Sequence, residues 1–225
     1  MNKTEIEWVR NPDGSAGFTW NPVVGCTYGC SYCFARRMAK RFKHRCLDCY
    51  RFFPHLHEER LGQPQKRRKP ASVFVCDMGD LFDPNVDDET VKKVIADAEK
   101  SPQHFFFLLT KQAWRLCNFS FPQNSWLGVT CDGRGRDSAR LTCLRDLKAA
   151  DHRFVSFEPL LGPISELSLH KIDWVIIGAQ TQPENRPDPA WVQRILDEAQ
   201  RYSIPVFMKN NLRRPSRSQQ FPSRG

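Results

Sequence analysis

Residues 25–34 of this chain read Gly25-Cys26-Thr27-Tyr28-Gly29-Cys30-Ser31-Tyr32-Cys33-Phe34 and place three cysteines in one short loop. Their spacing is C-x3-C-x2-C, with an aromatic residue directly before the last cysteine. Iron–sulfur clusters are normally held by four cysteines, so a local set of three leaves one iron of a [4Fe–4S] cube without a protein ligand. An open position on a bound metal is where chemistry takes place, as in catalytic zinc sites. The spacing therefore favours an enzyme.

The spacing alone leaves two other interpretations open. The three cysteines could belong to a zinc site completed by a distant ligand, or they could be ordinary buried thiols. Closed zinc sites usually pair two units of the C-x2-C type, and here only Cys46-Leu47-Asp48-Cys49 could supply the second unit.

Length and composition indicate one globular domain of 225 residues, with 40% hydrophobic residues to form a core. The polar start of the chain does not resemble a signal peptide, and no run approaches the ~18 apolar residues of a membrane span. Nine cysteines in such a chain indicate metal binding or catalysis more than disulfides. We therefore expect a cytoplasmic protein that does not bind a membrane.

The chain has 34 basic and 25 acidic residues, so its net charge is +9. The basic residues concentrate in four runs, at 36–37, 40–41, 66–69 and 213–214. Basic patches favour polyanions such as nucleic acid, although a solvated basic surface without such a partner would look the same. Both interpretations stay open.

Short apolar segments alternate with amphipathic ones along the chain. A helix is expected from Asp87 through Ala98, because its apolar residues recur at i, i+3, i+4 and i+7 and its first turn is acidic. Other helices are expected at 34–42, 141–148 and 191–201, and strands at 18–24, 72–76, 105–109, 126–130, 154–157, 174–177 and 206–208. Near-continuous apolar strands separated by helices predict an α/β fold, namely a partial, open TIM-type (β/α)6–7 barrel with parallel strands and outer helices.

This barrel domain is expected to cover residues 1–212. An irregular insertion rich in Cys, His and basic residues lies at about 43–70, and a long irregular segment of this kind is often functional. The basic residues 213–225 are expected to form a disordered tail.

Polar residues follow the expected strands, at the ends where active sites gather in parallel βα folds. Asp80 and Glu158 stand out, because a carboxylate after a buried strand needs a partner such as an ammonium, a ribose hydroxyl or a basic side chain.

Cys26, Cys30, Tyr32 and Cys33 match the C-x3-C-x-aromatic-C signature, and the chain therefore resembles the radical S-adenosylmethionine (radical SAM) superfamily. This resemblance implies a partial barrel with a [4Fe–4S] cluster held by the three cysteines, S-adenosyl-L-methionine on the open iron, and Tyr32 near its adenine. It implies an enzyme that cleaves S-adenosylmethionine reductively to a 5′-deoxyadenosyl radical, with an electron donor such as a flavodoxin or ferredoxin as partner.

Further segments resemble a phage-associated radical SAM-like family of unknown function, often labelled phage protein thirty-seven/sixty-eight-like. The similar segments occur in order from about Ile6 to Lys209 and include 20–26, 78–82, 109–111, 126–130, 158–163, 173–178 and 186–187. The ordered series is more specific than the cysteine spacing alone.

The resemblance also implies roles for residues at the strand ends. Met78, Gly79 and Asp80 take the place of the motif that contacts the S-adenosylmethionine amino group. Thr130 and Asp132 are expected to contact its ribose or carboxylate. The residues expected to face the reaction centre are Glu158, Arg186 and Lys209.

This chain departs from similar sequences at two places. Gln180 stands where they often carry a glutamate, and Asp132 stands where a longer acidic residue is expected. Both changes leave the substrate undetermined, and neither affects the cysteine loop.

Cys46 and Cys49 are followed by His55 and His57, which together have the composition of a Cys2His2 zinc site. Two histidines separated by one residue are, however, unusually close for joint ligation. An auxiliary iron–sulfur cluster, or two ordinary thiols in a lid whose histidines contact substrate, are alternatives. The sequence leaves this second metal site open.

The sequence thus predicts a radical SAM enzyme of unknown substrate, with nucleic acid as the first substrate class to test. A zinc-stabilised nucleic-acid-binding protein without catalysis, and a regulatory protein that binds a cluster, are the alternatives.

Overall fold

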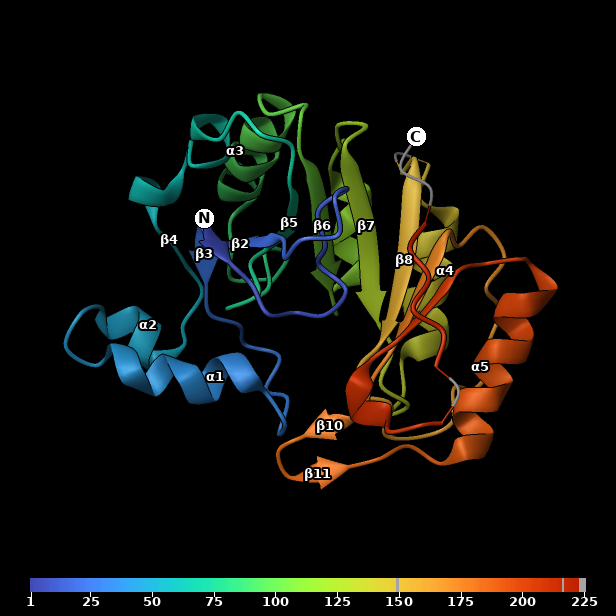
Figure 1. Ribbon diagram of the computed structural model, residues 1–225. Coiled ribbons are helices and arrows are strands. Elements are labelled where there is room, and N and C mark those ends of the chain that lie inside the picture. Colours follow the sequence, from blue (N-terminus) through green and yellow to red (C-terminus); the bar gives the residue numbers. More distant parts are fainter. Residues whose placement is uncertain (149, 216, 223–225) are drawn as a thin grey trace.

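The computed structural model describes residues 1–148, 150–215 and 217–222, and its centre is an eight-stranded sheet (Figure 1). The order of strands across the sheet is β1-β2-β5-β6-β7-β8-β9-β12. The bounds are β1 (Asn2–Lys3), β2 (Phe18–Trp20), β5 (Ser72–Val75), β6 (Phe105–Thr110), β7 (Ser125–Thr130), β8 (His152–Phe157), β9 (Trp174–Ile177) and β12 (Val206–Met208).

Every neighbouring pair from β2 to β12 is parallel, and only β1 at the edge runs antiparallel to its neighbour. The strands also lie side by side in the order in which they occur along the chain. Sequential parallel neighbours are the arrangement of a (β/α) barrel, and a sheet with two free ends makes it an open one. The expected α/β fold with an open parallel barrel is therefore confirmed.

Five α-helices are present among the described residues: α1 (Phe34–Ala39), α2 (Leu47–Arg51), α3 (Asp88–Glu99), α4 (Asp137–Asp146) and α5 (Pro189–Arg201). The helix α3 begins where expected, because Asp87 accepts a hydrogen bond from the backbone N–H of Thr90 at 2.7 Å. It buries the predicted apolar stripe, which includes Val91 and Val94, in the larger core cluster. The helices α3, α4 and α5 all pack on this outer face of the sheet.

Two expected elements are divided in the structure. The strand expected at 18–24 is interrupted at Asn21 and Pro22, so that β3 (Val23–Val24) leaves the main sheet and pairs antiparallel with β4 (His55–Leu56). The helix expected at 34–42 ends at Ala39 and continues as a 3-10 turn, Lys40–Phe42. The insertion after it is partly regular, since it contains α2, β4 and two further 3-10 turns, Glu58–Arg60 and Pro64–Lys66.

The inner face of the sheet is closed by aromatic side chains. Trp8, from the segment between β1 and β2, lies with its ring centroid 5.7 Å from that of Phe107 and 6.0 Å from those of Phe154 and Trp174. These rings form a second core cluster, separate from the one beneath the helices. Gly128 belongs to this face, because a Cβ there would lie 2.4 Å from the Phe154 ring. The floor of the barrel is therefore filled by packed rings.

The segment expected to be a disordered tail contacts the sheet. The backbone N–H of Met208 donates to the carbonyl of Ser218 at 2.7 Å, and that of Gln220 donates to Val206 at 3.0 Å. The Phe221 ring packs against Trp174. Residues 218–221 thus differ from the expectation of disorder because they pair with the edge of β12, while residues 216 and 223–225 of that expected tail lie outside the described residues.

No helix among the described residues is long and apolar enough to cross a membrane.

Candidate functional site

The cysteine loop begins at Gly25, directly after β3, where two segments of backbone pass very close to it. Gly25 has a φ of +100°, and a Cβ there would lie 2.3 Å from the carbonyl oxygen of Phe53. Its N–H donates to Met78 at 3.0 Å, and its carbonyl accepts from the N–H of Asp80 at 3.2 Å. Gly79 fits against the same residue, since a Cβ at position 79 would lie 2.6 Å from the Gly25 oxygen. Only glycine permits this position of the loop.

The three cysteines that follow Gly25 in this loop are half-buried free thiols. The Sγ of Cys26 accepts a hydrogen bond from the N–H of Tyr28 at 3.4 Å, and the Sγ of Cys33 accepts one from the N–H of Arg36 at 3.3 Å. Cys33 thereby caps the N-terminus of α1. Burial raises the pKa of the Cys26 and Cys30 thiols, so a cation is needed to hold both as thiolates near neutral pH.

The loop is also fixed by an aspartate after β5. Asp83 is buried and accepts from the backbone N–H of Thr27 at 2.6 Å and from its hydroxyl at 2.8 and 3.0 Å. Burial favours the protonated carboxyl, but these donors outweigh it and hold the pKa of Asp83 below its usual range. No local pattern predicts this contact, because the two residues lie 56 positions apart in the chain.

Asp80, predicted to contact a cofactor, lies next to the loop with its carboxylate already occupied. It accepts from the Thr110 hydroxyl at 2.8 Å and from the N–H groups of Lys111 at 3.2 Å and Phe82 at 3.0 Å. The structure thus shows Asp80 joining the ends of β5 and β6. Met78 packs, like Cys26 and Cys33, against the small buried cluster of Ala35, Ala39 and Phe52, and its contact with a cofactor, like that of Gly79, stays a prediction.

Lys111, Asp132 and Tyr32 meet between the ends of β6 and β7. The Lys111 ammonium lies 2.6 Å from Oδ2 of Asp132 and 2.7 Å from the Tyr32 hydroxyl, which itself donates to Asp132. Burial would raise the pKa of Asp132, but the Lys111 charge, the hydrogen bonds from Lys111 and Tyr32 and the Arg140 charge together outweigh burial and lower it. This network brings Asp132 and Tyr32 together, and the contact of either residue with a cofactor stays a prediction.

Lys111 was not among the predicted site residues, although the alternation of β6 points to it. Phe107 and Leu109 face the inner cluster, and side chains two apart share a face of a strand. Lys111 continues that series by one step, so a lysine there faces the barrel interior.

Two further contacts surround this network. Arg140, on α4, donates to the Tyr28 hydroxyl and, through Nη1, to the carbonyl of Thr130 at 3.2 Å. Asp137 accepts from the backbone N–H of Asp132 at 3.1 Å. Thr130 itself is buried at the end of β7, and its predicted contact with a ribose or carboxylate stays a prediction.

Glu158 and Lys209 form a second ion pair, from the ends of β8 and β12. Burial would lower the pKa of Lys209, but Glu158 outweighs burial and raises it, so the ammonium keeps its proton at neutral pH. Gly178 leaves room for the pair, because a Cβ there would lie 3.0 Å from Cδ of Lys209 and 3.1 Å from Cγ of Glu158. The structure therefore brings these two predicted residues together.

Arg186 does not join them. It follows the hairpin of β10 (Gln180–Thr181) and β11 (Glu184–Asn185), where its side chain is exposed and pairs with Glu184 at 3.1 Å. The hairpin lies on the side toward which β7 points, near α1 (Figure 1), and the carbonyl of Gln182 accepts from Arg37 at 3.3 Å. A reaction-centre role for Arg186 stays a prediction, which would need its ion pair with Glu184 to break.

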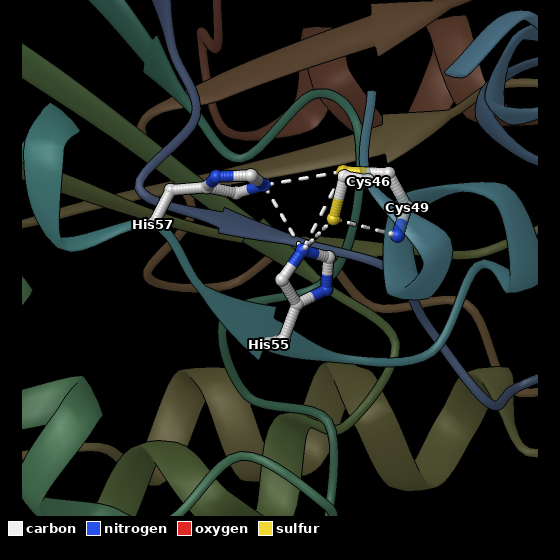
Figure 2. Close-up of side chains that lie close together, drawn as sticks. All are labelled: Cys46, Cys49, His55 and His57. Atoms are coloured by element: carbon white, nitrogen blue, oxygen red, sulfur yellow. Dashed lines mark hydrogen bonds between the residues drawn. The ribbon is translucent and has the colours of Figure 1, made fainter. Parts of the chain in front are cut away.

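The remaining predicted pair, Cys46 and Cys49, lies beside β4 together with His55 and His57 (Figure 2). The four ligand atoms of these side chains lie within 4.8 Å of one another. The structure thus brings together the two histidines and two cysteines that the sequence left unassigned.

Fold and site together define an open parallel (β/α) barrel with a three-cysteine loop and two ion pairs at the carboxyl ends of its strands. By sequence, the chain belongs to the family described as "Protein of unknown function (DUF5131)", whose model matches residues 3–217. No curated protein matches the sequence.

The solved structures that are similar in fold include two mutants of spore photoproduct lyase. The first, a double mutant with bound AdoMet and dinucleoside spore photoproduct, is 12% identical, with a TM-score of 0.53 over 85% of this chain and 62% of that chain. The second, a mutant with a single cysteine-to-serine change, is 11% identical, with a TM-score of 0.52 over 92% of this chain and 78% of that one. The chain thus spans less than two thirds of the first of these proteins, and the likeness is one of fold.

Proposed function

We propose that this protein is a radical SAM enzyme. The observation that carries the proposal is the position of the three-thiol loop, at the end of the first parallel strand of an open barrel and next to the polar ends of the other strands. A protein of the same fold has been solved with AdoMet bound, which supports the proposal.

The donor set fits a [4Fe–4S] cluster held by Cys26, Cys30 and Cys33. All three thiols are free and half-buried, and two of their sulfurs accept backbone hydrogen bonds, which in iron–sulfur proteins tune the reduction potential. When bound, the cluster and S-adenosylmethionine would supply reductive cleavage of the latter to methionine and a 5′-deoxyadenosyl radical.

The protein's own residues would bind and orient the cofactor and substrate. Asp132 is held as a carboxylate by Lys111, and Lys209 is held as an ammonium by Glu158. Each pair presents one positive and one negative group at a strand end, which suits a ligand such as an amino acid moiety that carries both charges. Tyr32 would then lie near the adenine, as the sequence resemblance implies.

For the substrate we propose nucleic acid. Four large apolar side chains are exposed on α1 and α2 and in the loop that follows α2: Phe34, Leu47, Tyr50 and Phe53. Arg36 on α1 is exposed as well, and so are Lys40 and Arg41 on the 3-10 turn that follows α1. Aromatic side chains interleaved with basic ones bind unpaired bases and phosphates together. The dinucleoside photoproduct in the similar structure belongs to the same chemical class.

Three further features are proposed on the sequence resemblance. They are an electron donor of the flavodoxin or ferredoxin kind, a cytoplasmic location and an association with phages.

Anaerobic reconstitution with iron and sulfide tests the cluster. We expect a brown protein that loses its colour and iron in Cys30→Ala and keeps both in Cys117→Ala, a matched change at an exposed thiol. With S-adenosylmethionine and a strong reductant, the wild-type protein should release 5′-deoxyadenosine and the Cys30→Ala variant should not. A protein that takes up zinc and no iron would refute the proposal in favour of a zinc-stabilised binding protein. A cluster without 5′-deoxyadenosine would favour a regulatory role.

Binding to a labelled single-stranded oligonucleotide tests the substrate class. Affinity should fall as salt rises, since binding releases counterions, and should fall further in Lys40→Glu/Arg41→Glu. The matched control is Lys92→Glu/Lys93→Glu on α3, which removes the same charge from another exposed surface. No binding at low salt, or equal loss in both variants, would exclude nucleic acid recognition by the 3-10 turn that follows α1.

A further inference from the structure

The side chains of Cys46, Cys49, His55 and His57 converge on one point (Figure 2). Nε2 of His55 lies 3.4 Å from the sulfurs of both Cys46 and Cys49, and Nε2 of His57 lies 3.1 Å from the sulfur of Cys49. The two Nε2 atoms lie 3.0 Å apart. We infer that these four side chains bind one structural Zn²⁺ ion.

The separations fit a tetrahedral zinc site. Zinc bonds of ~2.3 Å to sulfur and ~2.0 Å to nitrogen give tetrahedral edges of about 3.3 Å between two nitrogens and about 3.5 Å between sulfur and nitrogen. The observed 3.0–3.4 Å lies within a few tenths of an ångström of these edges. The ligand atoms are therefore already placed for the ion.

The outer nitrogens of both rings fix which ring atoms face the ion. Nδ1 of His55 lies 2.8 Å from the carbonyl oxygen of Phe53, and Nδ1 of His57 lies 2.9 Å from Oε1 of Glu59. Both partners only accept hydrogen bonds, so each Nδ1 carries a proton, which leaves Nε2 as the ring atom available to a metal. Two lone pairs facing each other at 3.0 Å repel unless a cation lies between them, and zinc-binding histidines have such outer partners as a rule.

The local backbone explains how such close residues converge. Cys46 caps the N-terminus of α2, and its sulfur accepts from the N–H of Cys49 at 3.4 Å. Phe52, with a φ of +58°, then turns the chain into β4. Side chains two apart on an extended segment share a face, so His55 and His57 can ligate together. The sequence objection to their spacing holds for helices, where zinc-binding histidines lie further apart.

The mixing of ligands distinguishes one ion from a cluster. In a [2Fe–2S] centre with two cysteines and two histidines, the cysteines bind one iron and the histidines bind the other. Here the thiol of Cys49 lies against both imidazoles, so cysteines and histidines do not separate into two pairs. Four protein ligands leave no open position, which is the mark of a structural site.

The ion would fix the segment that supports the three-cysteine loop. The carbonyl of Phe52 accepts from the N–H of Cys26 at 3.2 Å, and Phe53 lies against Gly25. Zinc bound on both sides of this turn would therefore hold the surface on which the loop rests. This inference does not depend on the function of that loop.

Metal analysis of the full-length protein, purified anaerobically, tests the inference. We expect about one zinc per chain in the wild type, in Cys26→Ala and in Cys117→Ser, and little zinc in Cys46→Ser or His57→Ala. Cys26→Ala should lose only iron, so failure of the zinc site and failure of the proposed cluster give different results. Wild-type protein without zinc, or equal zinc in the ligand variants, would overturn the inference.

A variant outside the ligand set guards against misfolding. Glu59 is exposed, with 68% of its side chain accessible, and Glu59→Ala removes the outer partner of His57, together with the ion pair between Glu59 and Arg60, while leaving all four ligands in place. In a competition titration of chelator-treated protein with Zn²⁺, this variant should bind ~10–100-fold more weakly than wild type. The tetrahedral site should also give intense visible absorption with Co²⁺ in its place. Unchanged zinc affinity in Glu59→Ala would overturn the inference.

Discussion

The ion pair between Lys111 and Asp132 can be tested without any cofactor. The two charges lie 2.6 Å apart, and only 11% and 6% of their side chains are exposed. Lys111→Met keeps most of the aliphatic stem and removes the ammonium. Asp132 would then keep the Tyr32 hydroxyl and the N–H of Arg134 as donors and lose the cation that lies directly against it.

The size of the effect follows from the burial of the pair. Two unit charges 2.6 Å apart attract by ~6 kcal/mol at an effective dielectric constant of about 20, and the cost of desolvating both offsets much of this. Removing one partner of a buried pair typically costs about 3–5 kcal/mol, because the other charge stays buried. We expect Lys111→Met to lower the free energy of unfolding by ~3 kcal/mol at neutral pH. Lys111→Met/Asp132→Asn should cost clearly less than the sum of the single changes.

The pH dependence gives a second measurement on the same residues. In the wild type, the pKa of Asp132 is lowered, so its stabilisation is present above the unfolded-state pKa of ~3.9 and lost as pH falls through the folded value. Without Lys111, burial dominates and the folded-state pKa rises above the unfolded one. The folded variant then binds more protons than its unfolded state. The difference in unfolding free energy between wild type and variant should therefore shrink as pH falls from 7 toward about 4.

Urea unfolding followed by tryptophan fluorescence would measure both effects, with Lys92→Met at an exposed position of α3 as control. The control should stay within ~0.5 kcal/mol of wild type, as exposed substitutions usually do. A role of this pair in stability would be refuted if the double variant lost as much unfolding free energy as the two single variants together. It would also be refuted if Lys111→Met were no less stable than Lys92→Met.

Two further changes test close approaches of the backbone. Gly79→Ala should break the close contact with Gly25 and its hydrogen bonds, which should lower the free energy of unfolding by ~1–3 kcal/mol and reduce iron uptake. Gly14→Ala, whose Cβ would meet nothing within 4 Å, should take up as much iron as the wild type. Metal analysis that finds normal iron in Gly79→Ala would contradict this. Gly128→Ala should lower the free energy of unfolding by ~1–3 kcal/mol, because its Cβ pushes into the Phe154 ring, and by less in a Phe154→Leu background. If thermal unfolding shows the same loss of stability in both backgrounds, the contact with Phe154 is not the cause.

Periodicity and apolar runs were enough to locate the main sheet. The expected bounds of β9 and β12, Trp174–Ile177 and Val206–Met208, are those of the structure. The strands that were missed, such as β1 and β10, are two residues long and at least partly exposed, so they carry no apolar pattern. Their pairing is decided by the backbone of neighbours that the local sequence does not reveal.

Candidate site residues could be predicted from the sequence where they lie close together along the chain in a characteristic spacing. The cysteine loop is such a case, because its three cysteines lie within eight residues. Lys111 and Tyr32 are 79 positions apart, and their contact forms only when the strands assemble into the open barrel. The spacing of His55 and His57 spoke against joint ligation, yet the structure brings both rings to the two cysteines, because residues two apart share a face on an extended backbone and not on a helix.

An open parallel sheet leaves two unpaired edges, and such edges invite pairing with other chains. Here β1 covers the edge at β2, and residues 218–220 cover the edge at β12. Both covers run antiparallel to the strands they shield, so neither extends the barrel itself. We expect these segments to limit edge-to-edge association: deleting residues 217–222 or 1–3 should favour self-association through the exposed edge, even though the carboxyl ends of the strands stay untouched.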